Sequence, residues 1–349
     1  MSVNVGALQK NLGFTPKMEE IYMEQREKDI VQSIFYLFDI SLDTCLSLRF
    51  QRLKLICIFS ESRYKKGISL QLNNYKRYFD LKAARQQHAS FILALRLVGV
   101  DVIELAASED NPMCCFTGET AAVIDGIALL SKLKVEKRQK EVERMKVVLR
   151  REGLDVRQCD DQYAQISAGD ILFTGKEIFV GLSNFTNLSG AKYVAMTYPD
   201  YPVNLIRVPK KHHLKYHVAL IGQNTLVFGS SQVSAIIKEQ ILELSDFGKQ
   251  YQTFTVRHDS HVGCISVNGR LFYISPTTCK VCSNQFDANV VDVIGEPIFN
   301  EFYKIHRGVQ ARVLIFNLFP KPILYNRVDS THEEKDMELN KIQTMSLYF

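Results

Sequence analysis

The chain has 349 residues, of which 46% are hydrophobic and 23% charged, and its formal net charge is +5. This composition is ordinary for a globular protein and excludes a largely disordered chain, and the length suffices for one large core or two modest ones. Basic and acidic residues are mixed, and the densest charged stretch, residues 132–151, alternates in sign like a solvated helix face. We therefore expect no nucleic-acid partner.

The sequence also argues against a secreted or membrane protein. Residues 1–17 lack the charged and apolar regions of a signal peptide. Residues 30–58 are apolar, but charged residues interrupt them too often for a bilayer span. The 8 cysteines are too few for a disulfide scaffold. We expect a cytoplasmic protein with reduced thiols and no membrane contact.

In chain order, residues 1–50 are expected to form an N-terminal extension, and the first predicted strand covers residues 52–59. Four predicted hairpins follow, in which two short apolar runs flank a turn dipeptide. The turns are Asp125-Gly126, Gly175-Lys176, Gln223-Asn224 and Asn268-Gly269, between residues 121–124 and 127–131, 171–173 and 178–182, 217–221 and 225–228, and 263–267 and 271–274.

A helical pattern and one more strand complete each unit. Apolar residues fall at helical spacing within residues 138–151 and again at Val233, Ile236, Ile237 and Ile241. The closing strands are predicted at residues 100–105, 154–158, 203–208, 252–256 and 290–294. The last core strand is predicted at residues 311–316, and residues 327–349 form a polar tail that we expect to be flexible.

The hairpin turns recur about every fifty residues, a period typical of a repeat architecture. Five hairpin–helix–strand units set radially make an α/β propeller, which we predict as a single domain over residues 51–326. A doubly wound α/β fold is the alternative. In the propeller the loops after the closing strands gather at one end of the axis, where we expect a site. These loops are residues 106–120, 159–169, 209–215, 257–262 and 295–312.

The motif GDILFTGKEIFVGLSNFTNLSGA at residues 169–191 resembles the dimethylarginine dimethylaminohydrolases of the pentein superfamily. The resemblance extends to RQQH (residues 85–88), residues 100–112, RQKEV (138–142), HLK (213–215), GSS (229–231) and VNG (267–269). It implies a pentein-type five-bladed α/β propeller and hydrolysis of Nω-methylated arginines to citrulline and methylamines, without a cofactor.

The family chemistry makes definite demands on side chains. A cysteine thiolate attacks the guanidinium carbon, and a histidine protonates the departing amine and then activates water. Acidic side chains hold the guanidinium group, and basic ones hold the carboxylate of the substrate. By resemblance, His213 of the HLK motif occupies the position of the catalytic histidine.

Most of the family's acidic positions are altered. The acidic pair corresponds to Gly118 and Glu119, and the acid before it corresponds to Met113. The acid that opens the family's Asp-Gly-Gly-Asp motif corresponds to Ser167, so that Asp170 alone remains from that motif. We therefore expect a less acidic and more apolar pocket.

The carboxylate-binding arginines are also missing. One corresponds to Lys132, which keeps the charge without the bidentate fork, and the other corresponds to Phe185, which is apolar. Asp259 lies in the fourth converging loop. Glu119, Lys132, Asp170 and Asp259 are therefore the candidate substrate-binding residues.

The nucleophile has no counterpart. The family's cysteine lies in a Thr-Cys-Cys-Ser run before the last core strand, where this chain has Gly308-Val309-Gln310, and no cysteine follows Cys282. Three earlier thiols are conceivable replacements, although buried cysteines are usually inert core residues. They are Cys114, Cys115 and Cys264.

Two further patterns concern metals. Cys279 and Cys282 have metal-binding spacing but no second pair. His258, Asp259 and His261, together with His213, would offer a metal cluster at the loop end, but surface histidines are the simpler interpretation. We expect no metal.

We interpret the chain as a degenerate dimethylargininase that has kept the fold and lost hydrolysis, with a small guanidino compound as its expected ligand. The alternative is an active dimethylargininase that uses a replacement thiol or a different C-terminal segment. A metal-binding or redox protein is the third interpretation. Protein partners are not indicated by the sequence.

Overall fold

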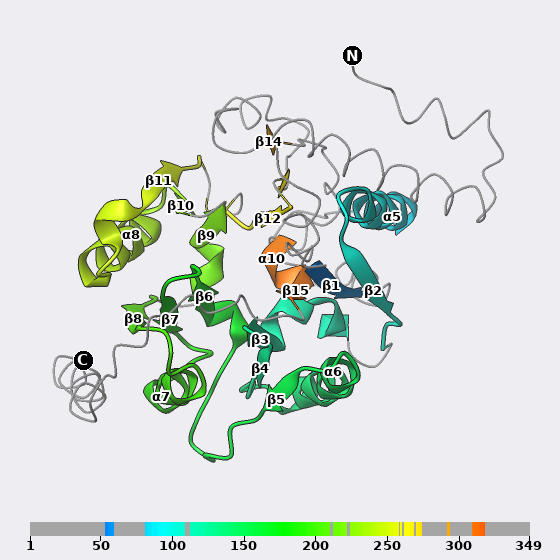
Figure 1. Ribbon diagram of the computed structural model, residues 1–349, viewed down its shortest axis with the longest axis horizontal. Helices are drawn as coiled ribbons and strands as arrows, with labels where there is room; N and C mark the ends of the chain where they lie inside the picture. Colours follow the sequence, from blue (N-terminus) through cyan, green and yellow to red (C-terminus); the bar gives the residue numbers. More distant parts are fainter. Residues whose placement is uncertain are drawn as a thin grey trace, which may run out of the picture. The chain divides into compact units, whose positions relative to one another are not determined.

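The computed structural model describes residues 53–58, 81–108, 112–209, 212–221, 224–257, 259, 262–268, 270–273, 292–293 and 309–317. All of them belong to the compact unit Arg52–Phe349. Within this part of the chain, five three-stranded sheets are set around a common axis (Figure 1). The predicted extension at residues 1–50 and the predicted tail at residues 327–349 lie outside the described residues, so the predicted domain limits stay predictions.

Three of the sheets repeat one pattern: two antiparallel strands, a helix, and a third strand parallel to the second. They are β3 (Ala121–Ile124), β4 (Ile127–Leu130), α6 (Gln139–Arg151) and β5 (Asp155–Arg157); β6 (Ile171–Phe173), β7 (Ile178–Leu182), α7 (Leu188–Thr197) and β8 (Val203–Arg207); and β9 (Val218–Ile221), β10 (Thr225–Phe228), α8 (Gln232–Leu244) and β11 (Gln252–Thr255). The fourth sheet holds β12 (Ile265–Val267), β13 (Arg270–Phe272) and β14 (Asp292–Val293). The predicted hairpins and closing strands are confirmed.

The turn chemistry explains the register of the first hairpin. Asp125 has φ of 46° and Gly126 has φ of 80°, the two left-handed residues that a type I′ turn needs. Ile124 consequently pairs directly with Ile127. Asn268, the first turn residue of the fourth hairpin, also has a left-handed φ, of 47°.

The fifth sheet is built from both ends of the described chain. Strand β1 (Leu53–Ile58) pairs antiparallel with β15 (Val313–Asn317) and parallel with β2 (Asp101–Leu105), which follows α5 (Leu81–Leu97). The pair β15–β1 takes the place that a hairpin takes in the other units (Figure 1). The predicted first strand is confirmed, and the predicted last strand begins later than expected, at Val313, because Ala311 and Arg312 belong to the helix α10 (Val309–Arg312).

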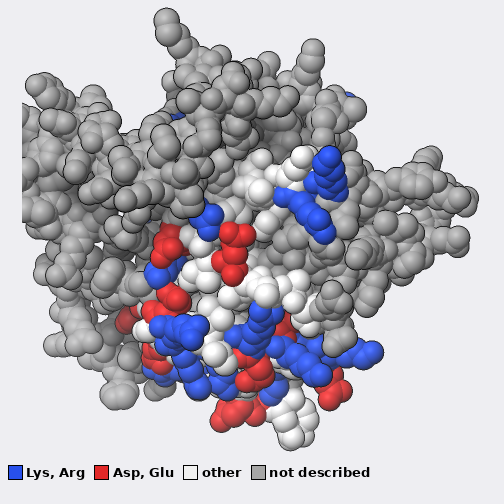
Figure 2. Space-filling model, turned by 90° about the vertical axis from the view of Figure 1, so that its right-hand side faces the viewer, with Lys and Arg blue, Asp and Glu red and all other residues white. Residues whose placement is uncertain are grey.

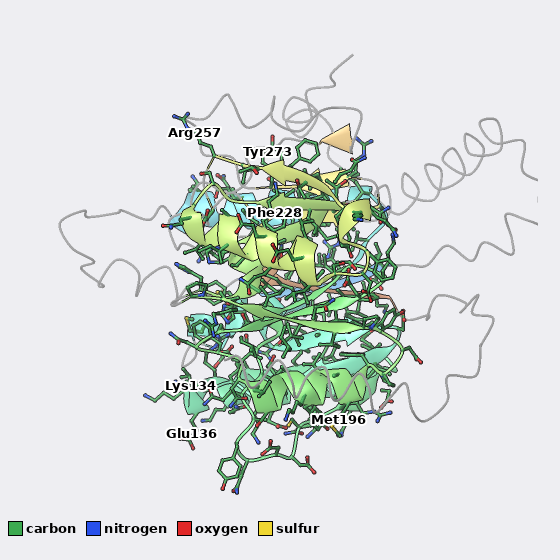
Figure 3. All side chains as sticks on the ribbon, turned by 90° about the vertical axis from the view of Figure 1, so that its left-hand side faces the viewer. Lys134, Glu136, Met196, Phe228, Arg257 and Tyr273 are labelled. Atoms are coloured by element: carbon green, nitrogen blue, oxygen red, sulfur yellow. The ribbon has the colours of Figure 1, made fainter. Side chains whose placement is uncertain are left out.

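The helices cover the outer faces of the sheets. Helix α6 buries Val142, Met145 and Leu149, while its outer side carries charges of both signs (Figure 2). In Figure 3, Phe228 lies inside the molecule and Met196 outside it, in line with exposed fractions of 1% and 71%. Ile236 of α8 falls at the helical spacing of the apolar residues, but it is 42% exposed. Among the described residues, no helix is long and apolar enough to cross a bilayer.

Candidate active site

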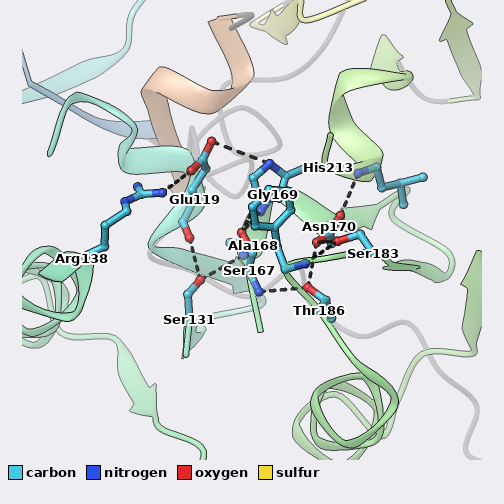
Figure 4. A network of polar contacts seen from close by, with 12 residues as sticks. Glu119, Ser131, Arg138, Ser167, Ala168, Gly169, Asp170, Ser183, Thr186 and His213 are labelled. Carbon is cyan, nitrogen blue, oxygen red and sulfur yellow. Dashed lines mark hydrogen bonds and ion pairs between the residues drawn. The ribbon is translucent and has the colours of Figure 1, made fainter. Parts of the chain in front are cut away.

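Three short 3₁₀ helices bring the site residues together. They are η2 (Thr117–Glu119), η4 (Ala168–Asp170) and η5 (Leu214–Tyr216), and each precedes the first strand of a hairpin. Helix η2 lies against η4, and η4 lies against η5. The expected gathering of loops at one end of the axis is therefore confirmed for these three (Figure 4).

His213 is the centre of this cluster. It directly precedes η5 and is 8% exposed. Its Nε2 lies 3.0 Å from Ser167 Oγ, and its ring stacks on Phe185 with 4.2 Å between centroids. A Cβ on Gly169 would come within 2.8 Å of the ring, so the imidazole needs a glycine there. The ring is thus held between neighbours on several sides.

The electrostatics favour a neutral His213. Burial lowers its pKa below the ordinary value, and Arg138 adds to this effect while Asp170 opposes it. Ser167 Oγ also accepts a hydrogen bond from Gly169 N. Nε2 of His213 is therefore engaged by a hydroxyl inside the protein.

Glu119 is held in an ion-pair network with the start of α6. It is 1% exposed, and Arg138 Nη1 donates to its Oε2 at 2.6 Å. The same guanidinium donates through Nε and Nη2 to Glu141 Oε2 at 3.0 and 2.8 Å. The other Glu119 oxygen lies 3.8 Å from His213 Nδ1, beyond hydrogen-bond distance. Glu119 thus lies between His213 and a guanidinium of the chain itself (Figure 4).

Asp170 is also satisfied internally. It is fully buried and accepts hydrogen bonds from Leu214 N at 2.8 Å, Ser183 Oγ at 2.7 Å and Thr186 Oγ1 at 2.8 Å. Burial raises the pKa of its carboxyl, whereas His213 and these hydrogen bonds act in the opposite direction. Because Leu214 follows His213, the bond to Leu214 N fixes the backbone that carries the imidazole.

The other two predicted substrate-binding residues make their contacts elsewhere. Lys132 Nζ donates to the carbonyl oxygen of Asp161. Asp259 accepts from the hydroxyl and backbone N–H of Ser231, the N-cap of α8, and lies 3.0 Å from His217 Nδ1. Burial raises its pKa, but the Ser231 hydrogen bonds and the neighbouring His217 act in the opposite direction, and the net effect is a lowered pKa. The structure thus pairs Asp259 with His217 rather than His213.

The candidate metal cluster lies partly outside the described residues. Among the described residues, no group of three or more His, Cys, Asp and Glu side chains is arranged to hold a metal ion. His258, His261, Cys279 and Cys282 lie outside these residues. Within the described part, the buried Nε2 of His217 has no hydrogen-bond partner.

The segment before the last strand closes over Gly118. Helix α10 (Val309–Arg312) leads into β15 and lies against η2. A Cβ on Gly118 would come within 2.1 Å of the carbonyl oxygen of Gln310 and 2.6 Å of that of Val313. No acidic side chain fits at position 118 beside this backbone, so the missing acid and the path of the C-terminal segment are linked.

The five described thiols, Cys57, Cys114, Cys115, Cys159 and Cys264, are buried. Burial raises the pKa of Cys57 and of Cys264 to about 12, and it also raises that of Cys159. Cys115 differs in its position, because it packs in a small cluster that includes Ala311 of α10. It is therefore a thiol beside the segment where the family's nucleophile would lie.

Sequence reasoning missed the partners that now hold the site. Arg138 and Glu141 belong to the RQKEV motif, whose three-residue spacing on a helix start was a signal for their contact. Ser167 was expected only to mark the position of a lost acid, yet its hydroxyl forms a hydrogen bond with His213. The pairing of His217 with Asp259 joins residues far apart in the chain, and no local pattern indicates it.

Comparisons with known proteins identify the group to which the chain is similar. The family profile described as eukaryotic N,N dimethylarginine dimethylhydrolase matches residues 68–250. The DDAH2 proteins of Homo sapiens and Bos taurus are 31% and 32% identical over 198 and 187 residues. These matches cover 56% and 53% of this chain, and 69% and 65% of the relatives' lengths.

Solved structures show the same fold. The dimethylarginine dimethylaminohydrolase of Pseudomonas aeruginosa, in complex with citrulline, superposes with a TM-score of 0.63 at 22% identity, over 76% of this chain and 100% of that one. The N-terminal domain of the cyanobacterial arginine dihydrolase ArgZ gives a TM-score of 0.61 at 16% identity, over 77% and 100%. The chain therefore belongs to the dimethylarginine dimethylaminohydrolase family and has the pentein fold, an α/β propeller of five units.

Proposed function

We propose that this protein is a dimethylargininase-like protein without hydrolase activity. One observation carries the proposal: the polar groups of the vestigial site already have partners within the chain. Arg138 holds Glu119, three donors hold Asp170, and Ser167 holds the Nε2 of His213. A substrate would have to break these buried interactions, each of which is costly to leave unmade.

The missing nucleophile supports the same conclusion. Hydrolysis through a covalent intermediate needs a thiolate next to the histidine. The segment before β15 reads VQAR, and burial keeps Cys57, Cys159 and Cys264 protonated by raising their pKa values. A histidine alone, in a neutral and internally bonded state, supplies no route to the guanidinium carbon.

Ligand binding is expected to be weak. The Pseudomonas aeruginosa enzyme holds citrulline, so the ligand class of this fold is the guanidino or ureido amino acid. Here the positions of the two carboxylate-binding arginines hold Phe185, stacked on His213, and Lys132, bonded to a carbonyl. We infer that any remaining ligand is a small guanidino compound without a tightly held carboxylate, taken up without a cofactor. The cytoplasmic location stays a prediction.

Citrulline release from asymmetric dimethylarginine tests the proposal. The purified full chain is compared with His213→Ala and with the Pseudomonas aeruginosa enzyme as positive control. We expect no release above the level of the histidine variant. Turnover that disappears on His213→Ala would contradict the loss of activity.

A replacement thiol is the competing explanation, and the place of Cys115 beside Ala311 is the observation that favours it. In that case Cys115→Ala would abolish turnover, whereas Cys264→Ala, which removes a thiol from a strand interior, would leave it unchanged. If neither substitution affects a measurable activity, the nucleophile is neither of these two thiols, and Cys114→Ala is tested next.

A further inference from the structure

The outer face of α6 gathers positive charge that the alternating sequence conceals. Along the chain, residues 132–151 alternate in sign, but a helix with about 3.6 residues per turn sorts them onto different sides. Positions 140, 144, 147 and 151 return to one side, because the spacing i, i+4, i+7, i+11 follows a single helix face, and this face lies opposite the buried residues of α6. We call this set the α6 stripe: Lys140, Arg144, Val147 and Arg151.

The acidic residues in and just after α6 are engaged with other cations. Glu141 pairs with Arg138 at 2.8 Å, Glu143 with Lys146 at 3.5 Å, and Glu152 with Lys54 at 2.6 Å. Among the ion pairs of the described residues, none includes Lys140, Arg144 or Arg151. Within the described part of the chain, the positive charge of the α6 stripe is therefore not neutralised by an ion pair.

The composition of the stripe does not serve the helix itself. Lys140 and Arg144 stand one turn apart, and like charges at this spacing destabilise a helix. Lys140 also lies in the first turn, where the helix dipole disfavours a cation. Val147, between the cations, is 68% exposed. Figure 2 shows Lys and Arg side chains gathered on this face of the molecule, with acidic ones among them. A binding role explains why these cations and an apolar residue occupy positions where acids would suit the helix better.

We propose that the α6 stripe is a docking surface for an acidic segment of a partner protein, which sets an apolar side chain against Val147. From Lys140 to Arg151 the helix rises about 17 Å. Roughly five residues of extended chain, at about 3.3 Å each, cover this length. Carboxylates on such a segment complement the charge of the stripe, and each guanidinium can bind a carboxylate through two hydrogen bonds. The inference is independent of the proposed function, because the stripe contains no residue of the vestigial site.

The surroundings of the stripe favour a narrow peptide over a broad polyanion. Glu136 and Glu143 are exposed, and the helical period places them along one flank of the stripe. A nucleic-acid duplex or an anionic lipid surface would meet these acids together with the cations, whereas an extended peptide can follow the cations alone. Val147 is a single small apolar side chain, which is too little for insertion into a bilayer. An acidic protein segment is therefore the partner that fits this face.

Fluorescence anisotropy of a labelled acidic peptide tests the inference on the full chain. The probe is Glu-Glu-Leu-Glu-Glu with blocked ends, at about 50 mM salt, because screening weakens such contacts at higher salt. We expect saturable binding, which Lys140→Glu combined with Arg144→Glu should weaken by roughly tenfold or more. A probe with Ser in place of Leu should bind about threefold more weakly, since it leaves Val147 without its apolar partner. If the double variant unfolds by circular dichroism, Lys140→Gln with Arg144→Gln replaces it.

A matched control separates the stripe from the net positive charge of the whole protein. Lys82→Glu combined with Lys249→Glu reverses two exposed charges, on α5 and on η6 (Gly248–Gln250), and should change the affinity by less than about twofold. Equal losses of affinity in the two double variants would overturn the inference. The absence of saturable peptide binding would overturn it too, as would a DNA duplex or a vesicle of anionic phospholipid that binds through the same residues more tightly than the peptide.

Discussion

Gly118→Ala is the sharpest test of how the C-terminal segment closes the site. The added Cβ would lie 2.1 Å from the carbonyl oxygen of Gln310 and 2.6 Å from that of Val313. Both atoms belong to the backbone, so no side-chain rotation relieves the clash, and the entry into β15 has to move. Overpacking of this kind costs about 1–3 kcal/mol, and we expect the upper end, about 3 kcal/mol.

Urea unfolding followed by circular dichroism measures this cost, with Gly153→Ala as control. Gly153 has φ of 83° but open space around its Cβ, so its substitution costs only the left-handed backbone strain, about 1–2 kcal/mol. Gly118 lacks that backbone strain. We nevertheless expect Gly118→Ala to lower the free energy of unfolding by more than Gly153→Ala does. Equal or smaller destabilisation by Gly118→Ala would refute the idea that α10 occupies the place of the missing acid.

Three further predictions concern the polar groups. Ser167→Ala leaves the buried Nε2 of His213 without its partner and should destabilise the fold by about 1–3 kcal/mol in the same unfolding assay. Lys132 Nζ is exposed and donates to a carbonyl oxygen, so Lys132→Ala should lower the free energy of unfolding by less than about 0.5 kcal/mol. A larger decrease would mean that Lys132 has a further structural role. Burial lowers the folded-state pKa values of His213 and His217, so the unfolded state binds more protons below about pH 6.5, and stability should fall as the pH drops from about 6.5 toward those lower values. The free energy of unfolding of the unmodified chain and of His213→Gln, measured across that pH range, checks this. The same slope against pH in both proteins would contradict it.

Local signals predicted much of the fold because its repeat is local. Each hairpin is specified by two short apolar runs and a turn whose dihedral angles select particular residues, as at Asp125 and Gly126. The pairing of β1 with β15 joins opposite ends of the described chain, and no turn signal reports such a contact. The exposed Ile236 shows the same limit: helical spacing predicts a face, but the neighbouring elements decide how wide the buried face is.

The part of the site that lies in recognisable motifs could be predicted from the sequence, whereas the part that depends on tertiary packing could not. His213 and Asp170 lie together as the motifs indicated, joined through Leu214 N. The interaction of Glu119 with Arg138 depends on how η2 meets the start of α6, which is a tertiary contact. Asp259 was grouped with His213 because its loop was expected to converge, whereas its hydrogen bonds tie it to Ser231 at the start of α8 and its carboxylate lies beside His217.

The central claim is that Glu119, Asp170 and His213, the described polar groups of the proposed vestigial site, are not available to an external guanidino amino acid. Calorimetric titration of the full chain with asymmetric dimethylarginine tests it most directly, with the Pseudomonas aeruginosa enzyme as a binding control. The account predicts no binding heat at micromolar concentrations, because Glu119, Asp170 and His213 are held by Arg138, by three hydrogen-bond donors and by Ser167. Micromolar affinity that disappears in Glu119→Gln would contradict it.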